Sequence, residues 1–289
     1  MRILDDQIRE ALKERAEKLE QHFGGDVIHY YGPIYSNVEK AFRDFIEKVK
    51  TGNPHQGRLI VFLNTSGGSA ETVEKLVNII RFHYSEVYFV VPDYAISAGT
   101  IFCMSGDKIF MDYSSSLGPI DPQVFNGKEY VPALGYLDQV GLMIEKSKKK
   151  QLSDAELLML QNLDLAMLRR FEQARDLTIS LLKKWLVEYK FSDWKVHSTT
   201  QSMKGQPVSK EEKEARAEEI ANALSDNKLW HSHGRMIAIG TLTCVLRLKI
   251  EDYSDNTPLR LLIRHYNDFL IEYVQRQNYT LFLHNKNYF

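Results

Sequence analysis

A glycine-containing segment at residues 63–69 (LNTSGGS) follows a continuous apolar run and precedes a helical pattern. Its adjacent glycines, Gly67 and Gly68, allow backbone N–H groups to point outward at a helix N-terminus, where they can bind an anion or an oxyanion. The alternative interpretation is a tight turn in which Ser69 caps the following helix.

A serine flanked by small residues occupies a second junction, at residues 93–100 (DYAISAGT). Ser97 at a turn from strand to helix resembles a nucleophile elbow, in which small neighbours permit the sharp turn and give substrate access to the hydroxyl. The N–H of Ala98 would then face developing negative charge. The alternative is that Ser97 serves only as a helix N-cap.

The elements around these junctions predict a parallel sheet. Residues 58–63 (RLIVFL) and 86–91 (EVYFVV) are the continuous apolar runs of strands covered on both faces, and 108–111 is a third short strand. Helical patterns separate them, as in βαβ units. Both junctions should therefore open at the same edge of the sheet, with the Gly67 and Gly68 amides near the carbonyl that Ser97 attacks. Losing one such donor typically costs ~3 kcal/mol of transition-state stabilisation.

The remaining segments suggest three regions. We expect an N-terminal helix in 1–23, an α/β domain in 24–150, and a mostly helical region in 151–289 that packs on the core and on neighbouring subunits. Within the last region, the capping box of Ser153 and Glu156 opens a helical stretch that extends to about Lys190. A loop or linker at 191–209, helices at 211–224, 234–248 and 258–276, and a strand or arm at 279–289 complete the prediction.

Composition excludes several classes of protein. The 289 residues are 44% hydrophobic and 26% charged, as in a folded protein. Lys and Arg number 37 against 38 Asp and Glu, so no global field would gather nucleic acid. No apolar run has the ~20 residues of a membrane span, and the charged N-terminus lacks a signal-peptide core. With only Cys103 and Cys244, both expected to be buried thiols, we expect a cytoplasmic protein without a metal or organic cofactor.

Three motifs together resemble those of a known family. SGG (66–68), SAG (97–99) and LGPIDPQ (117–123) are similar to the Clp/crotonase superfold. Within it, the sequence most resembles the serine dehydrogenase proteinase family of Clp-like serine peptidases, relatives of signal peptide peptidase A. The resemblance extends over residues 26–123. It implies a Clp/crotonase-like parallel sheet, Ser97 as nucleophile, an oxyanion hole from Gly67, Gly68 and Ala98, and a ring-like or dimeric homo-oligomer.

The general base departs from the pattern of Clp peptidases. There a histidine follows the serine by about 25 residues, whereas residues 117–123 contain none and the next histidine after Ser97 is His197. His233 is one candidate base, with His231 as its neighbouring substitute, because imidazole titrates near neutrality.

A lysine is a second candidate, as in the Ser–Lys dyads of signal peptide peptidase relatives. In the KSKKK run, Lys146 follows a partly apolar segment, and a catalytic lysine must be desolvated to lose its proton. Asp121 and Asp164 are more plausible as orienting carboxylates than as bases. The base can also be absent or supplied otherwise.

The expected activity is hydrolysis of peptide bonds in extended polypeptide through a Ser97 acyl-enzyme, because a strand-like peptide can add beside the edge of such a site. One alternative is a crotonase-like enzyme, in which the same amides stabilise the enolate of an acyl-CoA thioester. The other is a catalytically inactive scaffold that keeps the fold for assembly. No nucleic-acid or membrane partner is expected.

Overall fold

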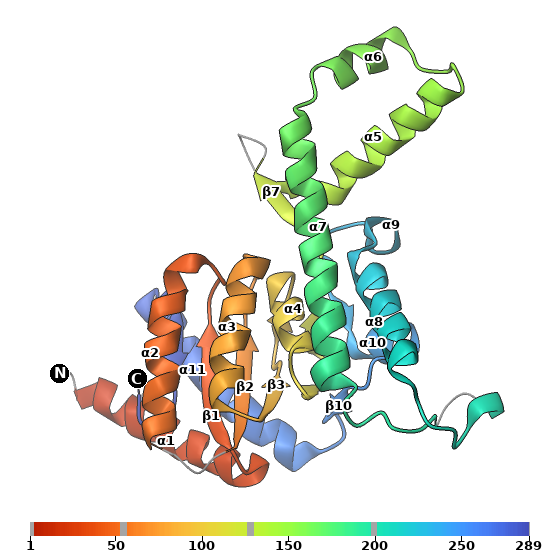
Figure 1. Cartoon of the computed structure of the whole chain (residues 1–289). Coiled ribbons are helices and arrows are strands. Elements are labelled where there is room, and N and C mark those ends of the chain that lie inside the picture. The colour runs from red at the N-terminus through yellow and green to blue at the C-terminus, as the bar shows by residue number, and fades with distance from the viewer. Residues whose placement is uncertain (1–2, 53–56, 126–129, 198–200, 289) are drawn as a thin grey trace.

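The computed structural model describes residues 3–52, 57–125, 130–197 and 201–288. A six-stranded sheet forms its centre, in the order β10-β5-β3-β2-β1-β11 (Figure 1). Five strands run parallel and β11 pairs with β1 antiparallel at one edge. The strands are β1 (Asp26–Tyr31), β2 (Arg58–Asn64), β3 (Glu86–Val90), β5 (Lys108–Met111), β10 (Glu251–Asp252) and β11 (Phe282–His284).

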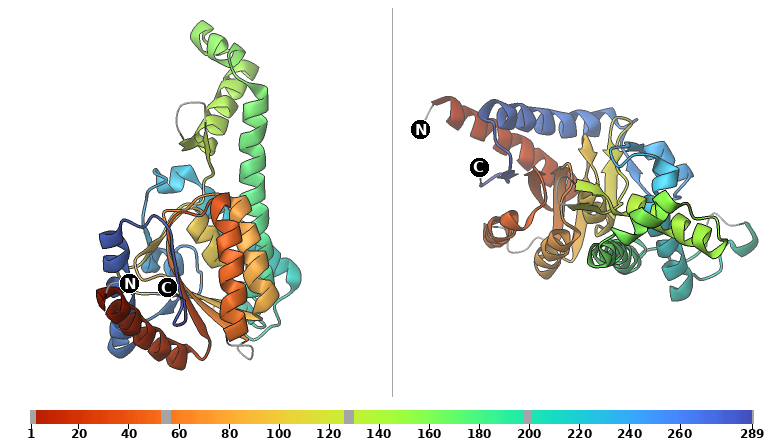
Figure 2. Two further views of the ribbon diagram at one scale, coloured as in Figure 1. Left: turned by 90° about the vertical axis from the view of Figure 1, so that its left-hand side faces the viewer. Right: turned by 90° about the horizontal axis from the view of Figure 1, so that it is seen from above.

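Both faces of the sheet are buried, which explains the continuous apolar runs of its central strands. In β2, Val61 and Leu63 join one hydrophobic cluster and Phe62 joins the other. Helices cover the two faces separately (Figure 2). On one face lie α2 (Glu39–Gly52), α3 (Ala70–His83), α4 (Ala98–Met104), α7 (Leu165–Trp185) and α8 (Lys210–Ser225), and on the other lie α1 (Ile3–Phe23) and α11 (Thr257–Gln277).

A second, three-stranded sheet lies beyond the end of β3. It pairs β4 (Tyr94–Ala95) with β6 (Ser116–Leu117) in parallel, and β6 with β9 (Ile237–Ala238) antiparallel. The helix expected at 234–248 therefore begins later and is shorter, as α10 (Ile239–Cys244). Ile237 is buried and faces Leu117 across this sheet, so tertiary pairing overrides the local helical pattern.

An arm projects from the body of the molecule (Figure 1). It consists of the hairpin β7 (Gln123–Phe125) and β8 (Tyr130–Pro132), α5 (Ala133–Lys148), α6 (Asp154–Gln161) and the first turns of α7. The helical stretch expected at 153–190 is thus interrupted. Asp164 begins α7 by accepting hydrogen bonds from the backbone N–H groups of Ala166 and Met167, so its carboxylate has a capping role.

Residues after 150 are closely integrated with the α/β core. β10 and β11 extend the central sheet at its two edges, and α11 packs against α1. The tail at 279–289 contains a strand, one of its two expected forms. Cys103 is buried as expected, whereas Cys244 is exposed.

Short elements complete the described chain: a 3₁₀ turn at Ser36–Val38, a π-helical turn at Leu186–Lys190, a 3₁₀ turn at Gln201–Met203 and α9 (Asn227–Trp230). Among the described residues, we find no helix with the length and apolar character needed to cross a membrane.

Candidate active site

Ser97 occupies a strained corner between β4 and α4. Its backbone has φ +55° and ψ −119°, and its side chain makes no capping hydrogen bond to α4. A non-glycine residue in such a conformation costs about 1–3 kcal/mol and persists only where its surroundings enforce it. Thr100 helps to enforce it, because its Oγ1 donates to the carbonyl of Ala95 and accepts from the N–H of Gly118, both at 2.9 Å. The geometry differs from the N-cap alternative and agrees with an elbow.

The glycine pair at the end of β2 forms the facing corner. The backbone of Ile34 anchors it: its N–H donates to the carbonyl of Gly67, and its carbonyl accepts from the N–H of Ser69, each at 2.8 Å. Gly67 has φ +103°, and a Cβ there would lie 2.7 Å from the Cβ and 3.2 Å from the Oγ of Ser97. From standard bond lengths, the nitrogen of Gly68 therefore lies no more than about 8 Å from that hydroxyl oxygen. The two corners converge.

The amides of this corner are not equivalent. The N–H of Gly67 donates to Oγ1 of Thr65 at 3.0 Å, which differs from the expected use of this group for an oxyanion. Within the part of the chain that the structure describes, the N–H groups of Gly68 and Ala98 have no hydrogen-bond acceptor. These two donors are therefore available to a ligand beside Ser97.

His233 and Asp121 form a close pair. Nδ1 of His233 lies 2.6 Å from Oδ1 of Asp121, whose side chain is buried, while that of His233 is 23% exposed. The carboxylate accepts the Nδ1–H of the imidazole, which leaves Nε2 as the basic nitrogen. Sequence reasoning considered each residue separately but did not predict that they pair.

The three-stranded sheet directs this pair and Ser97 toward the same end. Ala95, Leu117 and Ile237 form one row across β4, β6 and β9. Ser97 follows β4 and lies two residues beyond the row, and Asp121 follows the parallel strand β6 and lies four residues beyond it. His233 lies four residues before the row, in the turn that leads into the antiparallel strand β9, so it also lies beyond the same end.

The structure does not bring the other candidates to Ser97. Nζ of Lys146, on α5 of the arm, lies 2.5 Å from Oε1 of Glu156, and its side chain is half exposed. His231 is exposed at the C-terminal end of α9. Asp164 caps α7, and His197 faces Glu212.

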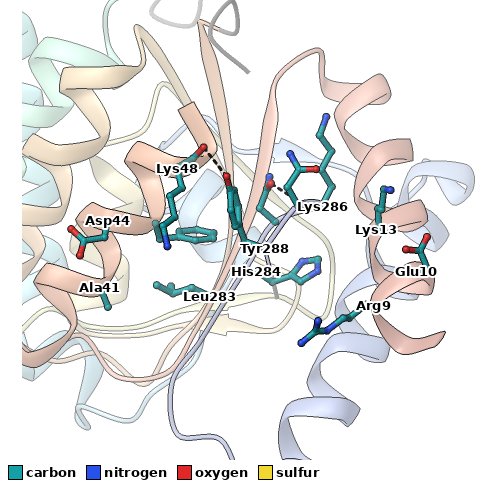
Figure 3. A pocket seen from close by; sticks show the side chains of 13 residues that line it. Arg9, Glu10, Lys13, Ala41, Asp44, Lys48, Leu283, His284, Lys286 and Tyr288 are labelled. Carbon is teal, nitrogen blue, oxygen red and sulfur yellow. Dashed lines mark hydrogen bonds between the residues drawn. The ribbon is translucent and has the colours of Figure 1, made fainter. Parts of the chain in front are cut away.

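A separate cavity of about 780 Å³ lies between α1, α2 and the C-terminal tail (Figure 3). Its lining includes Arg9, Asp44 and Lys48, and the hydroxyl of Tyr288 donates to the carbonyl of Lys48 at 3.1 Å. No residue of the Ser97 corner lines it. Over the described residues, we also find no cluster of three His, Cys, Asp or Glu side chains suited to a metal ion.

The sequence also matches the model of a known protein family. A family model described as "ClpP-like SDH-type serine proteinase" matches residues 26–212. The chain belongs to this family of ClpP-like serine proteinases.

Two curated relatives are the uncharacterized proteins MJ0137 and MJ1495 of Methanocaldococcus jannaschii. They are 29% and 27% identical to this chain over 92 residues, which is 32% of this chain and 32% of each relative. The match thus spans about a third of the length of these relatives.

Solved structures that this chain matches include two described as a stomatin-specific protease and ClpP1. A serine-to-alanine mutant of the 1510-N membrane-bound stomatin-specific protease is 18% identical, with a TM-score of 0.37, over 55% of this chain and 61% of that chain. A mutant of ClpP1 from Listeria monocytogenes is 15% identical, with a TM-score of 0.34, over 57% and 77%.

Proposed function

We propose that this protein hydrolyses peptide bonds through an acyl-enzyme on Ser97, with His233 as general base and Asp121 as its orienting carboxylate. The observation that carries the proposal is the 2.6 Å His233–Asp121 pair beyond the same end of the small sheet as the strained Ser97 corner. A serine hydroxyl is a weak nucleophile, and a base held by a third group is the usual means of activating it.

In the acylation step, Oγ of Ser97 attacks the scissile carbonyl carbon while Nε2 of His233 takes the hydroxyl proton. The buried Asp121 carboxylate stabilises the imidazolium that forms, and the Gly68 and Ala98 amides donate to the oxyanion. When the tetrahedral intermediate breaks down, the C–N bond breaks and the leaving amine takes the proton from His233. A water molecule, activated by His233, then hydrolyses the ester and regenerates Ser97.

Gly67 has a different role in this proposal. Its amide is used within the turn, and its missing side chain makes room for Ser97. Lys146 receives no catalytic role, because it is ion-paired with Glu156 on the arm. We further propose that extended polypeptide is the substrate class and that the protein acts as a homo-oligomer.

A fluorophosphonate probe tests the assignment, because it phosphonylates an activated serine. Intact mass should show one adduct on the wild-type chain and none on Ser97→Ala. His233→Ala should label at least 100-fold more slowly, whereas the matched His231→Ala should label within about threefold of wild type.

Three results would contradict the proposal. Labelling that persists in Ser97→Ala would assign the nucleophile elsewhere. A chain that does not label but is stabilised against heat by an acyl-CoA would instead indicate crotonase-like binding, and a chain that does neither would indicate a scaffold.

A further inference from the structure

An acidic recess opens beside the Ser97 corner. It has a volume of about 450 Å³ and lies where β1, β2 and the turn after β3 meet α11. Among the residues that the structure describes, three acidic side chains, Asp93, Asp268 and Glu272, line it, and no lysine, arginine or histidine does. Such a lining favours a ligand that is positively charged and donates hydrogen bonds.

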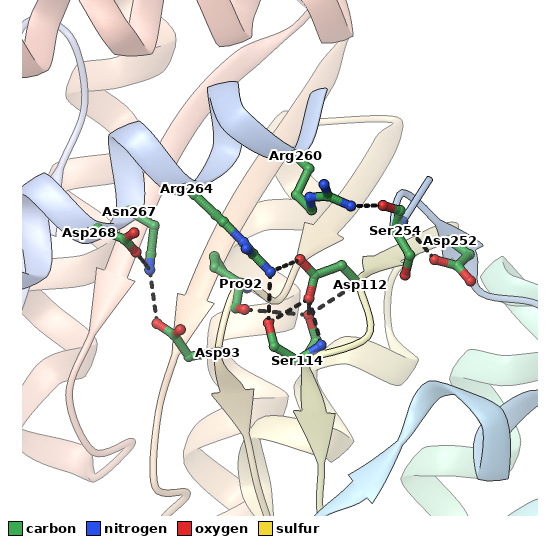
Figure 4. A network of polar contacts seen from close by, with 11 residues as sticks. Pro92, Asp93, Asp112, Ser114, Asp252, Ser254, Arg260, Arg264, Asn267 and Asp268 are labelled. Carbon is green, nitrogen blue, oxygen red and sulfur yellow. Dashed lines mark hydrogen bonds and ion pairs between the residues drawn. The ribbon is translucent and has the colours of Figure 1, made fainter. Parts of the chain in front are cut away.

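A chain of side-chain amides leads from this recess into the core, and its hydrogen bonds fix the orientation of each amide. Oδ2 of Asp93 accepts a hydrogen bond from Nδ2 of Asn267 at 2.8 Å (Figure 4). The opposite end of that amide, Oδ1 of Asn267, therefore accepts from Nδ2 of Asn64 at 2.6 Å. This orientation leaves Oδ1 of Asn64 as an acceptor.

That acceptor has no donor among the described residues, although Asn64 lines the recess and is only 3% exposed. A buried polar atom left without a partner costs about 1–3 kcal/mol. A hydrogen-bond donor that enters the recess would recover this cost. The Oδ1 atom of Asn64 and the carboxylates therefore point independently to the same kind of ligand, one that donates hydrogen bonds.

The charges of the recess are incompletely neutralised. Glu272 pairs with Arg276, but within the described ranges neither Asp93 nor Asp268 makes an ion pair. Arg264, one turn before Asp268 on α11, is held by Asp112 at 2.7 Å (Figure 4). Although Asp93 reaches the surface, enclosure by protein raises its pKa, and the nearby Asp268 and Asp112 raise it further.

The recess is within reach of a peptide bound at Ser97, because the same two junctions form both sites. Asn64 precedes Gly67 by three residues and Asp93 precedes Ser97 by four. A chain spans no more than about 3.6 Å per residue. The Cα atoms of Asn64 and Gly67 are therefore at most about 11 Å apart, and those of Asp93 and Ser97 at most about 14 Å. Three or four residues of extended peptide cover these distances.

From this arrangement we propose that the recess binds an ammonium or guanidinium group of the polypeptide substrate, a few residues from the scissile bond. The group is a lysine or arginine side chain or a free N-terminus. The proposal deepens the peptidase function and rests on it. It predicts selection for a positive charge at a fixed distance from the cleaved bond.

Binding to the uncleaving Ser97→Ala chain tests this proposal separately from catalysis. Fluorescein-labelled decapeptides of alanine and leucine would carry one lysine, moved in turn through the positions, or norleucine in its place. Each would be made with a free and with an acetylated N-terminus. Fluorescence anisotropy should show at least tenfold tighter binding for lysine at one or two adjacent positions, or for the free N-terminus.

The same measurement on Asp268→Asn in the Ser97→Ala background should remove this preference while norleucine peptides bind as before. Asp268 is exposed on α11, so the variant should fold. Asp176→Asn, a change at an exposed carboxylate on α7, is the matched control and should keep the preference.

Equal binding of the lysine, free-terminus and norleucine peptides would overturn the proposal. A preference for the positive charge that survives Asp268→Asn would overturn it as well. Neither result would affect the Ser97 assignment, which the fluorophosphonate experiment tests. Conversely, a failure of labelling together with a charge preference that Asp268→Asn removes would refute the peptidase mechanism and leave the recess as a cation-binding site.

Discussion

The Ser97 hydroxyl does not make the capping hydrogen bond that serines at the start of a helix usually make. The backbone of Ser97 nevertheless stays in a conformation that costs free energy. Two hydrogen bonds through Thr100 hold the adjoining segments in place. The strained backbone of Ser97 is not compensated by a capping hydrogen bond. Exposure of the hydroxyl therefore explains this conformation better than stability does.

We expect Asp121→Asn to reduce peptide hydrolysis and fluorophosphonate labelling by about 10²–10⁴-fold. An asparagine at this position can no longer stabilise the imidazolium of His233, and it can favour the wrong tautomer. Rates of labelling by intact mass, with circular dichroism to verify folding, measure the effect. Asp164→Asn, at the other carboxylate considered from the sequence, keeps a capping residue and should label at the wild-type rate; equal rates for the two variants would exclude a role for Asp121.

Asp26 should make stability depend on pH. Burial raises the pKa of this carboxyl to about 6, although the hydroxyl of Tyr84 donates to it at 2.7 Å. The folded state holds the proton more tightly than the unfolded state, whose aspartate pKa is about 4. Stability should therefore fall as the pH rises from about 4 to about 6, by at most about 3 kcal/mol.

Asp26→Asn removes this titration and keeps an acceptor for Tyr84. Urea unfolding at pH 4.5 and pH 7.5 should show a smaller loss of free energy of unfolding in the variant than in the wild type. The same loss in both proteins would mean that Asp26 is not the group responsible.

At the scale of elements, the turn after β2 determines where Ser97 can lie. We expect Gly67→Ala to reduce labelling at least 100-fold, because the new Cβ would lie 2.7 Å from that of Ser97 and displace it. Gly205→Ala is the matched control for backbone strain, since Gly205 also has a positive φ, +83°, but nothing lies within 4 Å of a Cβ there. If both variants label at the wild-type rate, the two corners are not in the contact that the structure describes.

The sequence was sufficient to predict the elements that bring Gly67 and Ser97 together. The segments that contain them follow β2 and β3, which are apolar on two faces, and adjacent parallel strands end at the same edge. The short strand β4, which separates Ser97 from β3, was not predicted. Local patterns could not predict the His233–Asp121 pair. Its two residues are 112 positions apart, and they meet through β9, whose residues resemble the start of a helix.

The recess beside Ser97 was also beyond prediction from the sequence. Asn64 ends β2 and Asp93 lies in the turn after β3, so polar side chains at the ends of apolar runs are a local signal. Their partner Asn267, however, comes from α11, 203 positions after Asn64. Only the packing of α11 on the sheet aligns these three side chains.

At the scale of the whole molecule, the arm exposes apolar side chains that the rest of the fold does not cover. Leu165 is 77% exposed and Leu158 is 60% exposed, and Met159, Leu142, Ile144 and Leu157 are exposed with them. Exposed apolar patches of this kind mark interaction surfaces. We propose that they form the subunit contacts of the expected homo-oligomer, through α5, α6 and the start of α7.

We therefore expect a double variant, Leu158→Asp with Met159→Asp, to lower the molar mass measured by light scattering after size-exclusion chromatography. Because these side chains are exposed, circular dichroism should remain unchanged. The control variant Leu261→Asp changes an exposed leucine on α11, away from the arm, and should keep the wild-type mass. An unchanged mass in the arm variant would place the subunit contacts elsewhere.

The position of β9 late in the chain has a consequence for biosynthesis. A ribosome makes the chain from its N-terminus, so Ser97 and the glycine corner emerge long before His233 and the strand that fixes it. The proposed catalytic group cannot be complete until β9 has been translated, about 140 residues after Ser97. A growing chain would thus carry the nucleophile without its base over this interval, and nearby nascent polypeptides would not be cleaved before β9 had formed.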